Sequence, residues 1–299
     1  EEMNLKIPKG NITIIIGANG CGKSTLLKVI SRILPAKRGE VRIDGMDIRK
    51  EKAEHIAKKV AVLPQTPTCP DAITVRELVS YGRFPYRKAI GGMSRHDIEQ
   101  VDWALEKTGL TEISGRLVTE LSGGQRQRAW IAMTLAQETE MILLDEPTAF
   151  LDVVSRIEIM TLLHRLASEE QRAILMSTHD IEQALVLGDK LWLLKKGKGL
   201  ECGVTEDLIL AHRMDTLFPH EDIRFDSMHG IYSPEVKGGK SIYLSASDEI
   251  LRHWAQNAMN RNGFLCLELP GADRKECLPL LEVKSANHLI LSTDRKSVV

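Results

Sequence analysis

Four short polar segments carry residue types that could bind and hydrolyse a nucleoside triphosphate, and they follow one another in a definite order. They are GANGCGKST at 17–25, LSGGQ at 121–125, the acids Asp145 and Glu146, and STHD at 177–180. Each has an ordinary explanation by itself: a glycine-rich turn, a capped helix, a pair of helix-capping acids or a structural histidine. Four in this order predict a chain that closes on ATP and hydrolyses it.

The segment GANGCGKST predicts a phosphate-binding loop. Gly20 and Gly22 allow backbone N–H groups to turn toward phosphate oxygens, and the start of the following helix adds positive potential. Lys23 is expected to reach the β- and γ-phosphates, while the Ser24 hydroxyl is expected to ligate Mg²⁺. The remaining loop residues expected to contact the nucleotide are Asn19, Cys21 and Thr25.

The acids and the histidine supply the residue types that hydrolysis requires. Asp145 is expected to hold the Mg²⁺ shell. Glu146 is the candidate general base, which would polarise water for attack on the γ-phosphate and accelerate it by roughly 10²–10⁴-fold. His179 is expected to hydrogen-bond the γ-phosphate and to orient the attacking water.

These side chains need strands to carry them to one place. The apolar runs at 12–16, 141–144 and 173–176 each precede one polar segment, and their composition is typical of strands buried on both faces of a parallel sheet. In open α/β sheets, ligands bind at the carboxyl ends of the strands. A helix is expected to follow the glycine loop and to end before Pro35.

Composition limits the class of protein. The 299 residues are 43% apolar and 27% charged with a net charge of −1, which argues against nucleic acid as the main partner. No apolar run reaches the ~18 residues of a membrane span, and no signal-peptide pattern opens the chain. Five scattered cysteines indicate neither a disulfide framework nor a zinc site, and they fit a reducing cytoplasm best.

The combined motifs resemble the ATP-binding-cassette (ABC) ATPase subunits of membrane transporters, over roughly residues 1–210. In this resemblance, 17–25 match the Walker A loop and 141–146 match Walker B. Gln65 matches the glutamine that contacts Mg²⁺ and senses the transmembrane partner. Asp152 lies in the segment that matches the D-loop, and His179 matches the switch histidine. The implied fold is α/β, a P-loop NTPase with a RecA-like core sheet and an α-helical signature subdomain.

The resemblance also implies how two copies work together. The signature residues of one copy would contact the γ-phosphate of ATP held by the other, so that two chains sandwich two ATP molecules head to tail. These residues are Ser122, Gly123, Gly124 and Gln125. Implied partners are a second copy, polytopic permease subunits and, indirectly, a substrate-binding protein. The implied location is the cytoplasmic face of the inner membrane.

A finer resemblance lies at 74–87, TVRELVSYGRFPYR, which is similar to the helical subdomain of importers of iron–siderophore, haem or vitamin B12. In those systems this region docks a coupling helix of the permease. Two other readings remain open. One is a soluble ABC ATPase acting on nucleic acid or the ribosome. The other is a non-hydrolysing binder, which the presence of Glu146 and His179 disfavours.

The chain is expected to divide into an ATPase domain at 1–221, with its helical subdomain at about 66–136, and a small α/β appendage at 222–299. In the appendage, strands are predicted at 241–244, 264–269 and 288–291. A helix capped by Asp248 is predicted to run through Asn262. Its apolar face is expected to consist of Ile250, Leu251, Trp254 and Ala258. Packing or dimer support and a regulatory or ligand-sensing role both remain open for it.

Both ends look shortened by comparison with the family. The chain lacks the earlier strand and the aromatic residue that stacks on adenine in family members, and it ends directly after a predicted strand. A longer chain is therefore expected to bind ATP more tightly.

Overall fold

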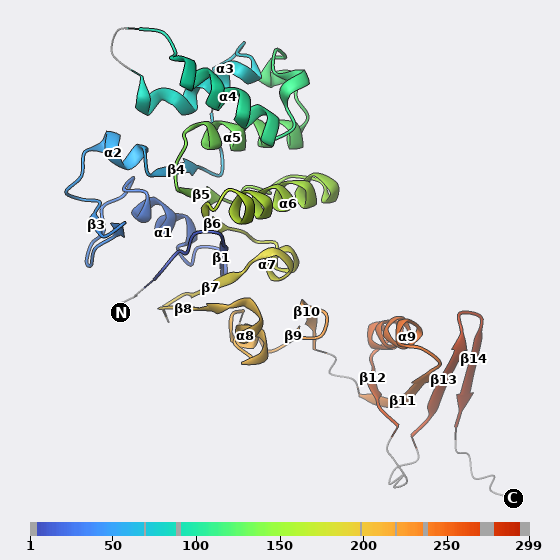
Figure 1. Cartoon of the computed structure of the whole chain (residues 1–299). Helices are drawn as coiled ribbons and strands as arrows, with labels where there is room; N and C mark the ends of the chain where they lie inside the picture. The colour runs from blue at the N-terminus through green and yellow to red at the C-terminus, as the bar shows by residue number, and fades with distance from the viewer. Residues whose placement is uncertain are drawn as a thin grey trace, which may run out of the picture. The chain divides into compact units, whose positions relative to one another are not determined.

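A computed structural model describes residues 5–68, 70–87, 91–197, 199–218, 220–235, 239–269 and 278–293 (Figure 1). The chain forms two compact units. The larger contains residues 1–219 and 225–231, and the smaller contains 220–224 and 232–299. A short hairpin, β9 (Ile223–Asp226) with β10 (Ile231–Pro234), has one part in each unit.

The larger unit is built on a six-stranded sheet in the order β4-β5-β6-β1-β7-β8. Every neighbouring pair is parallel except β7 and β8, which are antiparallel. The strands are β1 (Ile12–Ile16), β4 (Val60–Leu63), β5 (Met141–Asp145), β6 (Ala173–Ser177), β7 (Lys190–Lys195) and β8 (Gly199–Val204). The three strands predicted from apolar runs are therefore confirmed as β1, β5 and β6.

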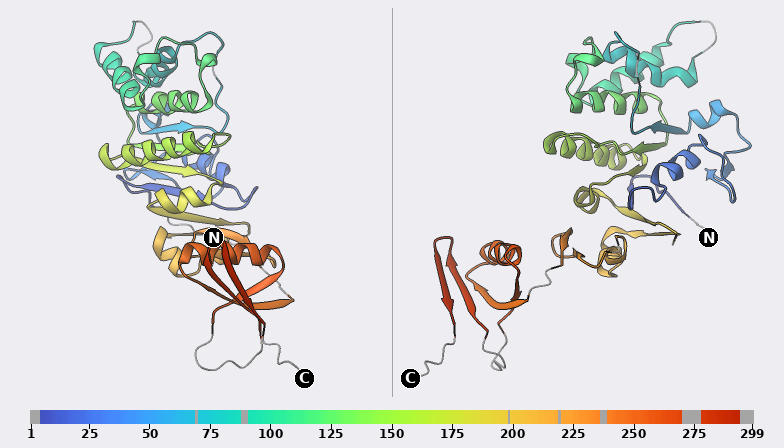
Figure 2. Two further views of the ribbon diagram at one scale, coloured as in Figure 1. Left: turned by 90° about the vertical axis from the view of Figure 1, so that its right-hand side faces the viewer. Right: turned by 180° about the vertical axis from the view of Figure 1, so that it is seen from behind.

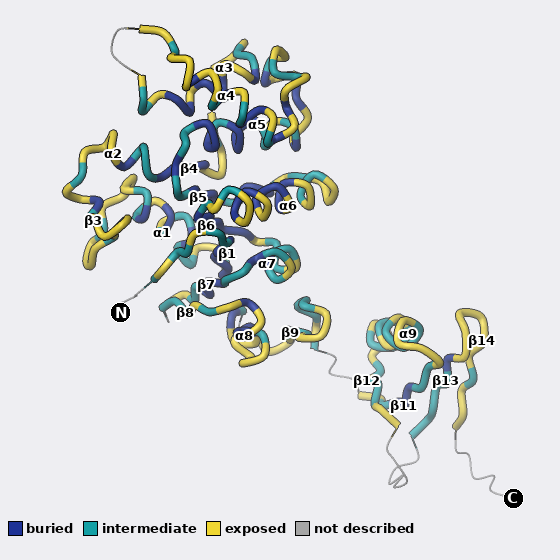
Figure 3. Tube along the Cα trace, viewed as in Figure 1, coloured by how far each residue is buried: buried dark blue, intermediate teal, exposed yellow. Residues whose placement is uncertain are grey.

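Strand β6 lies between β1 and β5, and Ile174 pairs with Ile12 on one side and Ile142 on the other. Every residue of β1 and β6 is buried, as expected for strands covered on both faces. Figure 3 shows this buried centre in dark blue. The arrangement brings the carboxyl ends of three functional strands to adjacent positions at one edge.

Helices cover both faces of this sheet (Figures 1 and 2). Helix α1 (Lys23–Ile30) lies on one side, and α6 (Val153–Glu169) and α7 (Ile181–Leu187) lie on the other. The core on the α1 side is a cluster of buried residues: Ile15, Leu27, Ile30, Ile43, Ile48, Ile56, Val60, Leu143, Leu175 and Trp192.

The helix that follows the glycine loop is shorter than its apolar pattern predicted. It ends at Ile30 rather than just before Pro35, because Arg32 adopts a left-handed backbone with φ 63°. Leu34 is consequently half-exposed instead of continuing the buried stripe.

The chain between β4 and β5 forms a helical layer. It consists of α3 (Val75–Ser80), η1 (Tyr81–Tyr86), α4 (Arg95–Lys107), η2 (Thr111–Ile113), η3 (Val118–Glu120) and α5 (Gly123–Ala136). Its three α-helices all begin with a capping box, in which Thr74, Ser94 and Ser122 bond reciprocally to the residue three positions on. A Cβ at Gly82 would lie 2.2 Å from the Met133 carbonyl, so glycine allows η1 to pack directly on α5.

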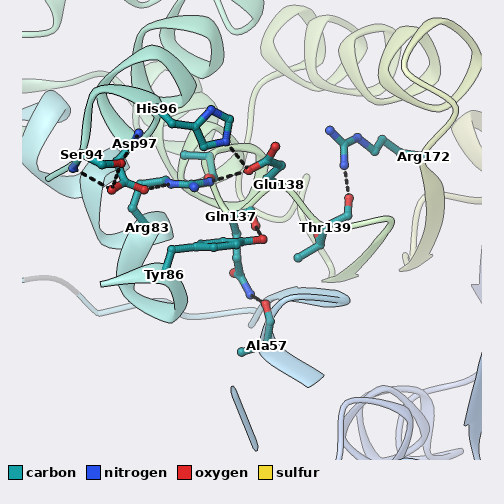
Figure 4. A network of polar contacts seen from close by, with 11 residues as sticks. Ala57, Arg83, Tyr86, Ser94, His96, Asp97, Gln137, Glu138, Thr139 and Arg172 are labelled. Atoms are coloured by element: carbon teal, nitrogen blue, oxygen red, sulfur yellow. Dashed lines mark hydrogen bonds and ion pairs between the residues drawn. The ribbon is translucent and has the colours of Figure 1, made fainter. Parts of the chain in front are cut away.

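A buried arginine joins this helical layer to the segment that precedes β5 (Figure 4). Arg83 in η1 is 1% exposed and donates to the Asp97 carboxylate at 2.8 Å, to the Ala136 carbonyl at 2.7 Å and to Glu138 at 3.1 Å. Its guanidinium also lies 4.1 Å from the centre of the Tyr86 ring. The network satisfies a buried cation with several partners, as burial of a charge requires.

The remaining elements of the larger unit are short. They are β2 (Arg42–Ile43), β3 (Met46–Asp47), α2 (Ala53–Ala57), α8 (Thr205–Leu210) and η4 (Met214–Thr216). Among the described residues of the chain, no helix is both long enough and apolar enough to cross a membrane.

In the residues that the structure describes, the smaller unit contains a four-stranded sheet and one helix. Its order is β12-β11-β13-β14, and only β13 and β14 pair antiparallel. The elements are β11 (Lys240–Ala246), α9 (Glu249–Arg261), β12 (Phe264–Leu267), β13 (Leu280–Ser285) and β14 (His288–Ser292). The predicted βαββ pattern missed β13, since Glu282 and Lys284 interrupt its apolar run.

The predicted apolar face of α9 was wrong for two of its residues. Ile250 and Trp254 are 72% and 63% exposed. Leu251 and Ala258, which the prediction placed on the same face, are instead half-buried together with Ala255. The side of α9 turned away from solvent is therefore centred about one position further around the helix than the sequence suggested.

Candidate functional site

The polar segments predicted to do chemistry converge at the carboxyl edge of the large sheet. Strand β1 leads into the glycine loop, β4 leads to Gln65, β5 ends at Asp145 before Glu146, and β6 ends at Ser177 before His179. These four strands are parallel, so their ends meet on the same side.

The glycine loop has the backbone geometry expected of a phosphate-binding loop. Gly20 and Gly22 have φ values of 73° and 109°, which are readily available to glycine alone. Gly17 is fixed by packing, because a Cβ there would lie 2.4 Å from the Leu194 carbonyl oxygen on β7. The Lys23 ammonium is buried and donates to the Gly17 carbonyl at 2.8 Å, so it lies within the loop.

Asp145 accepts two hydroxyl hydrogen bonds on the same carboxylate oxygen. Ser24 donates to Oδ1 at 3.0 Å from the start of α1, and Ser177 donates to it at 2.6 Å from the end of β6. A serine hydroxyl beside a carboxylate is a pair of hard oxygen ligands, the kind that Mg²⁺ takes from protein. Ser24 and Asp145 therefore fit a magnesium ion held next to the phosphate loop.

The Glu146 carboxylate contacts two other predicted groups, Gln65 and His179. Gln65 Nε2 donates to Oε2 of Glu146 at 2.7 Å, and His179 Nε2 contacts Oε1. The Glu146 backbone has φ 50°, a left-handed conformation that is unfavourable for a residue with a side chain. Strained backbone of this kind is concentrated at functional sites.

The signature residues lie at the start of α5, where Ser122 and Gly123 are exposed, Gln125 is half-buried and Gly124 is buried. Ser122 caps the helix by accepting from the Gln125 N–H at 3.2 Å, and the Gln125 side chain accepts from the Ser122 N–H at 3.1 Å. Across the described residues, no hydrogen bond or ion pair joins Ser122, Gly123 or Gln125 to the glycine loop of the same chain.

The signature helix packs directly against the segment containing Asp152. A Cβ at Gly124 would lie 2.6 Å from Ser155 Oγ, so only glycine permits this approach. Asp152 caps α6 by accepting from the Ser155 N–H at 2.9 Å, and this hydrogen bond lowers the pKa of its carboxyl.

The structure thus gathers Gln65, Glu146 and His179 into one cluster, with the Ser24–Asp145 pair at the ends of the same strands. The signature residues and Asp152 form a second group at the start of α5 and α6. Asn19, Cys21 and Thr25 belong to the glycine loop and its helix and take no part in the carboxylate cluster.

The sequence analysis did not identify two residues that contact the candidate site, Ser177 and Arg156. Ser177 was read only as part of the polar STHD segment, although its position at a strand end was a usable signal. Arg156 on α6 pairs with Asp180 at 2.6 Å and donates to the Leu151 carbonyl at 3.2 Å, which connects the Asp152 segment to the residue after His179. This link joins two segments far apart in the sequence.

The first strand of this parallel sheet leads into a glycine loop and a helix, and acids and a histidine lie at the same edge. This combination defines a P-loop nucleoside triphosphatase. Comparison with known proteins specifies the family. The family model described as ABC transporter matches residues 1–149. The iron(3+)-hydroxamate import ATP-binding protein FhuC of Bacillus subtilis is 47% identical over 218 residues, covering 73% of this chain and 81% of that protein.

Solved structures agree with this assignment. A metal-chelate type ABC transporter in an inward-facing conformation matches with a TM-score of 0.63 and 32% identity, over 73% of this chain and 81% of its own. The dimeric structure of MJ0796, a bacterial ABC transporter cassette, matches with a TM-score of 0.59 and 31% identity, over 69% and 90%. This chain belongs to the ABC transporter ATP-binding family, and it is an ATPase of that family.

Proposed function

We propose that this chain is the ATP-hydrolysing subunit of an importer that takes up an iron–siderophore, haem or cobalamin-type substrate through a separate membrane permease. The metal-chelate character of its relatives supports this cargo class. The same relatives favour transport over action on nucleic acid or the ribosome. The observation that carries the catalytic part is the cluster of Gln65 and His179 around the Glu146 carboxylate.

Each residue has a role in the proposed reaction. The loop N–H groups, including those of Asn19 to Thr25, and Lys23 bind the phosphates of ATP. Ser24, Asp145 and Gln65 would hold Mg²⁺, which would supply positive charge next to the phosphates of ATP. Glu146 accepts the proton of the attacking water, and His179 hydrogen-bonds the γ-phosphate and orients that water.

Two copies complete each site. Ser122 and the N–H groups at the start of α5 bind the γ-phosphate of ATP held by the other copy, where the helix start favours negative charge. The exposure of Ser122 and Gly123 and their lack of hydrogen bonds to their own glycine loop support this assignment, as does the dimeric cassette among the structural relatives. Asp152 lies beside them and takes part in the same interface.

The permease is proposed to contact the helical layer. Phe84 is 72% exposed on η1, while its neighbour Arg83 is buried. The buried Arg83 side chain holds the segment in place, and the exposed aromatic ring of Phe84 is available to a partner. In this arrangement the subunit works at the cytoplasmic face of the inner membrane, with a substrate-binding protein acting indirectly.

The decisive test is the Glu146→Gln variant of the whole chain. It is expected to bind ATP and to form a stable dimer in light scattering while turnover falls at least ~100-fold, the scale of one lost general base. Glu182→Gln, at an exposed position on α7, is the matched control and should keep wild-type turnover.

Transport is tested separately. Co-expression with candidate permeases should give co-purification and ATP-dependent uptake of a labelled ferric chelate, and Glu146→Gln should abolish uptake.

Wild-type turnover by Glu146→Gln would remove Glu146 from the base role. Uptake driven only for substrates other than metal chelates would overturn the cargo assignment.

A further inference from the structure

Ser177 bridges the two acids at the end of β5. Its hydroxyl donates to Asp145 Oδ1 at 2.6 Å and accepts from the Glu146 backbone N–H at 3.0 Å. Ser177 is 0% exposed, so water does not compete for either hydrogen bond. One side chain therefore fixes a carboxylate orientation and a backbone orientation at once.

The contact to Glu146 holds an unfavourable backbone conformation. The Glu146 N–H lies 3.2 Å from the Ser177 carbonyl as well as 3.0 Å from its hydroxyl, and Glu146 has φ 50°. A conformation of this kind persists only where surrounding contacts enforce it. The direction in which the Glu146 carboxylate points thus depends on Ser177.

The contact to Asp145 has a parallel consequence. Ser24 and Ser177 both donate to Oδ1, and the proposed function assigns the Ser24 oxygen to Mg²⁺. The orientation of Asp145 when ATP is bound then depends mainly on Ser177. The sheet register makes this possible, because Asp145 and Ser177 are paired residues of adjacent parallel strands.

We infer that Ser177 is a positioning residue for hydrolysis, which aims the Asp145 carboxylate at the metal and the Glu146 carboxylate at the attacking water. This inference rests on the proposed function, because it takes Asp145 and Glu146 as the metal ligand and the base. Ser177 itself touches neither nucleotide nor water in this role.

The test compares Ser177→Ala, which removes the hydroxyl, with Ser177→Thr, which keeps one. Thr13→Val is the matched control: Thr13 is equally buried on the adjacent strand β1, and its hydroxyl has no hydrogen-bond partner within the described residues. Each variant of the whole chain is assayed for kcat, for the KM of ATP and for melting temperature.

Mn²⁺ binding supplies a readout that does not depend on turnover. It is followed by electron paramagnetic resonance in the presence of a non-hydrolysable ATP analogue. Ser177→Ala should lower kcat about tenfold with KM changed less than about twofold, and weaken Mn²⁺ binding several-fold, the effect expected of lost hydrogen bonds to a charged group. Ser177→Thr should recover most of both.

Two results would overturn the inference. One is wild-type kcat and Mn²⁺ affinity in Ser177→Ala. The other is an equal loss in Thr13→Val, since the effect would then belong to any buried hydroxyl near the site. Failure of the proposed function looks different, because wild-type protein would show no hydrolysis that depends on Glu146.

Discussion

Glu146 shows at residue scale how the site can change state. Both of its carboxylate oxygens are occupied, one by the Gln65 amide and one by the His179 imidazole. A general base must be free to accept a proton from water. In the proposed reaction, Gln65 and His179 would turn from this carboxylate toward the metal and the γ-phosphate, so Glu146 would be their shared partner before ATP binds.

Cys21 provides a direct chemical probe of the glycine loop. Its sulfur lies 2.8 Å from where a Cβ on Gly17 would be, so the thiol occupies a tight space inside the loop. Alkylation with a maleimide should block nucleotide binding for steric reasons, and bound ATP should protect the thiol. Binding of a fluorescent ATP analogue measures the effect.

The Cys21→Ala variant is the control for this experiment and should bind nucleotide whether or not maleimide is added. The exposed Cys202 on β8 offers a second reference, since its modification should leave binding intact. Full nucleotide binding by protein modified at Cys21 would contradict the prediction.

At this scale, the sequence predicted which residues form the candidate site but not the contacts between them. The glycine loop, Asp145, Glu146 and His179 carry recognisable residue types at recognisable spacings. The bridge made by Ser177 depends on strand β6 pairing with β5 in one register, a contact between residues distant in sequence. Local patterns contain no information on such a pairing.

Among the elements, the helical layer is held to the sheet by a polar network rather than by apolar contacts alone. Arg83 reaches α4 through Asp97 (Figure 4). It reaches the end of α5 through the Ala136 carbonyl. The Gln137 side chain then donates to the Ala57 carbonyl at 2.5 Å and the Val60 carbonyl at 3.1 Å, beside β4. The η1 segment is thereby linked to the strand that leads to Gln65.

Asp97 should make the stability of this layer depend on acid. Burial by itself raises the pKa of Asp97, but hydrogen bonds from Ser94 and Arg83 outweigh it and lower the pKa to about 2. A depressed carboxyl pKa contributes stability that is complete above about pH 4 and is lost as pH falls toward 2. The contribution is about 2 kcal/mol at neutral pH.

Urea unfolding between pH 5 and pH 3 measures this dependence. Asp97→Asn should be destabilised at pH 5 by about 3 kcal/mol, because Arg83 loses a buried partner, and its deficit relative to wild type should shrink on acidification. Asp102→Asn, at an exposed ion pair on the same helix, should stay within about 1 kcal/mol of wild type. A deficit of Asp97→Asn that is constant with pH would contradict the assignment.

The sequence predicted strands correctly where an apolar run was unbroken. It failed where charged residues interrupted a strand or where the backbone ended a helix early. Strands β1, β5 and β6 were predictable because unbroken apolar runs suit only fully covered strands. Strand β13 was missed because charged residues alternate through it, and the end of α1 was missed because the left-handed Arg32 overrides a continuing apolar pattern. Tertiary context decided both.

For the whole molecule, two units with separate cores predict two thermal transitions. The described part of the smaller unit buries only Ile242, Tyr243, Leu244 and Val283 among its apolar residues, so it should melt at the lower temperature. A ligand that binds only the folded larger unit stabilises that unit alone. Magnesium and ATP, added to Glu146→Gln, should therefore raise only the upper transition.

Differential scanning calorimetry with and without nucleotide separates the two transitions. Addition of ADP in place of ATP is the control, and it should give a smaller shift because it cannot engage the signature residues of a second copy. A single transition that moves as a whole with nucleotide would show that the two units unfold together.

Gly124 on α5 packs against Ser155 on α6, so the starts of these two helices are held together. In the proposed dimer, a displacement of Ser122 toward the neighbouring copy would carry Asp152 with it. The Arg156–Asp180 ion pair would connect that displacement to the segment that contains His179. Nucleotide held by one copy would in this way influence the catalytic residues of the other.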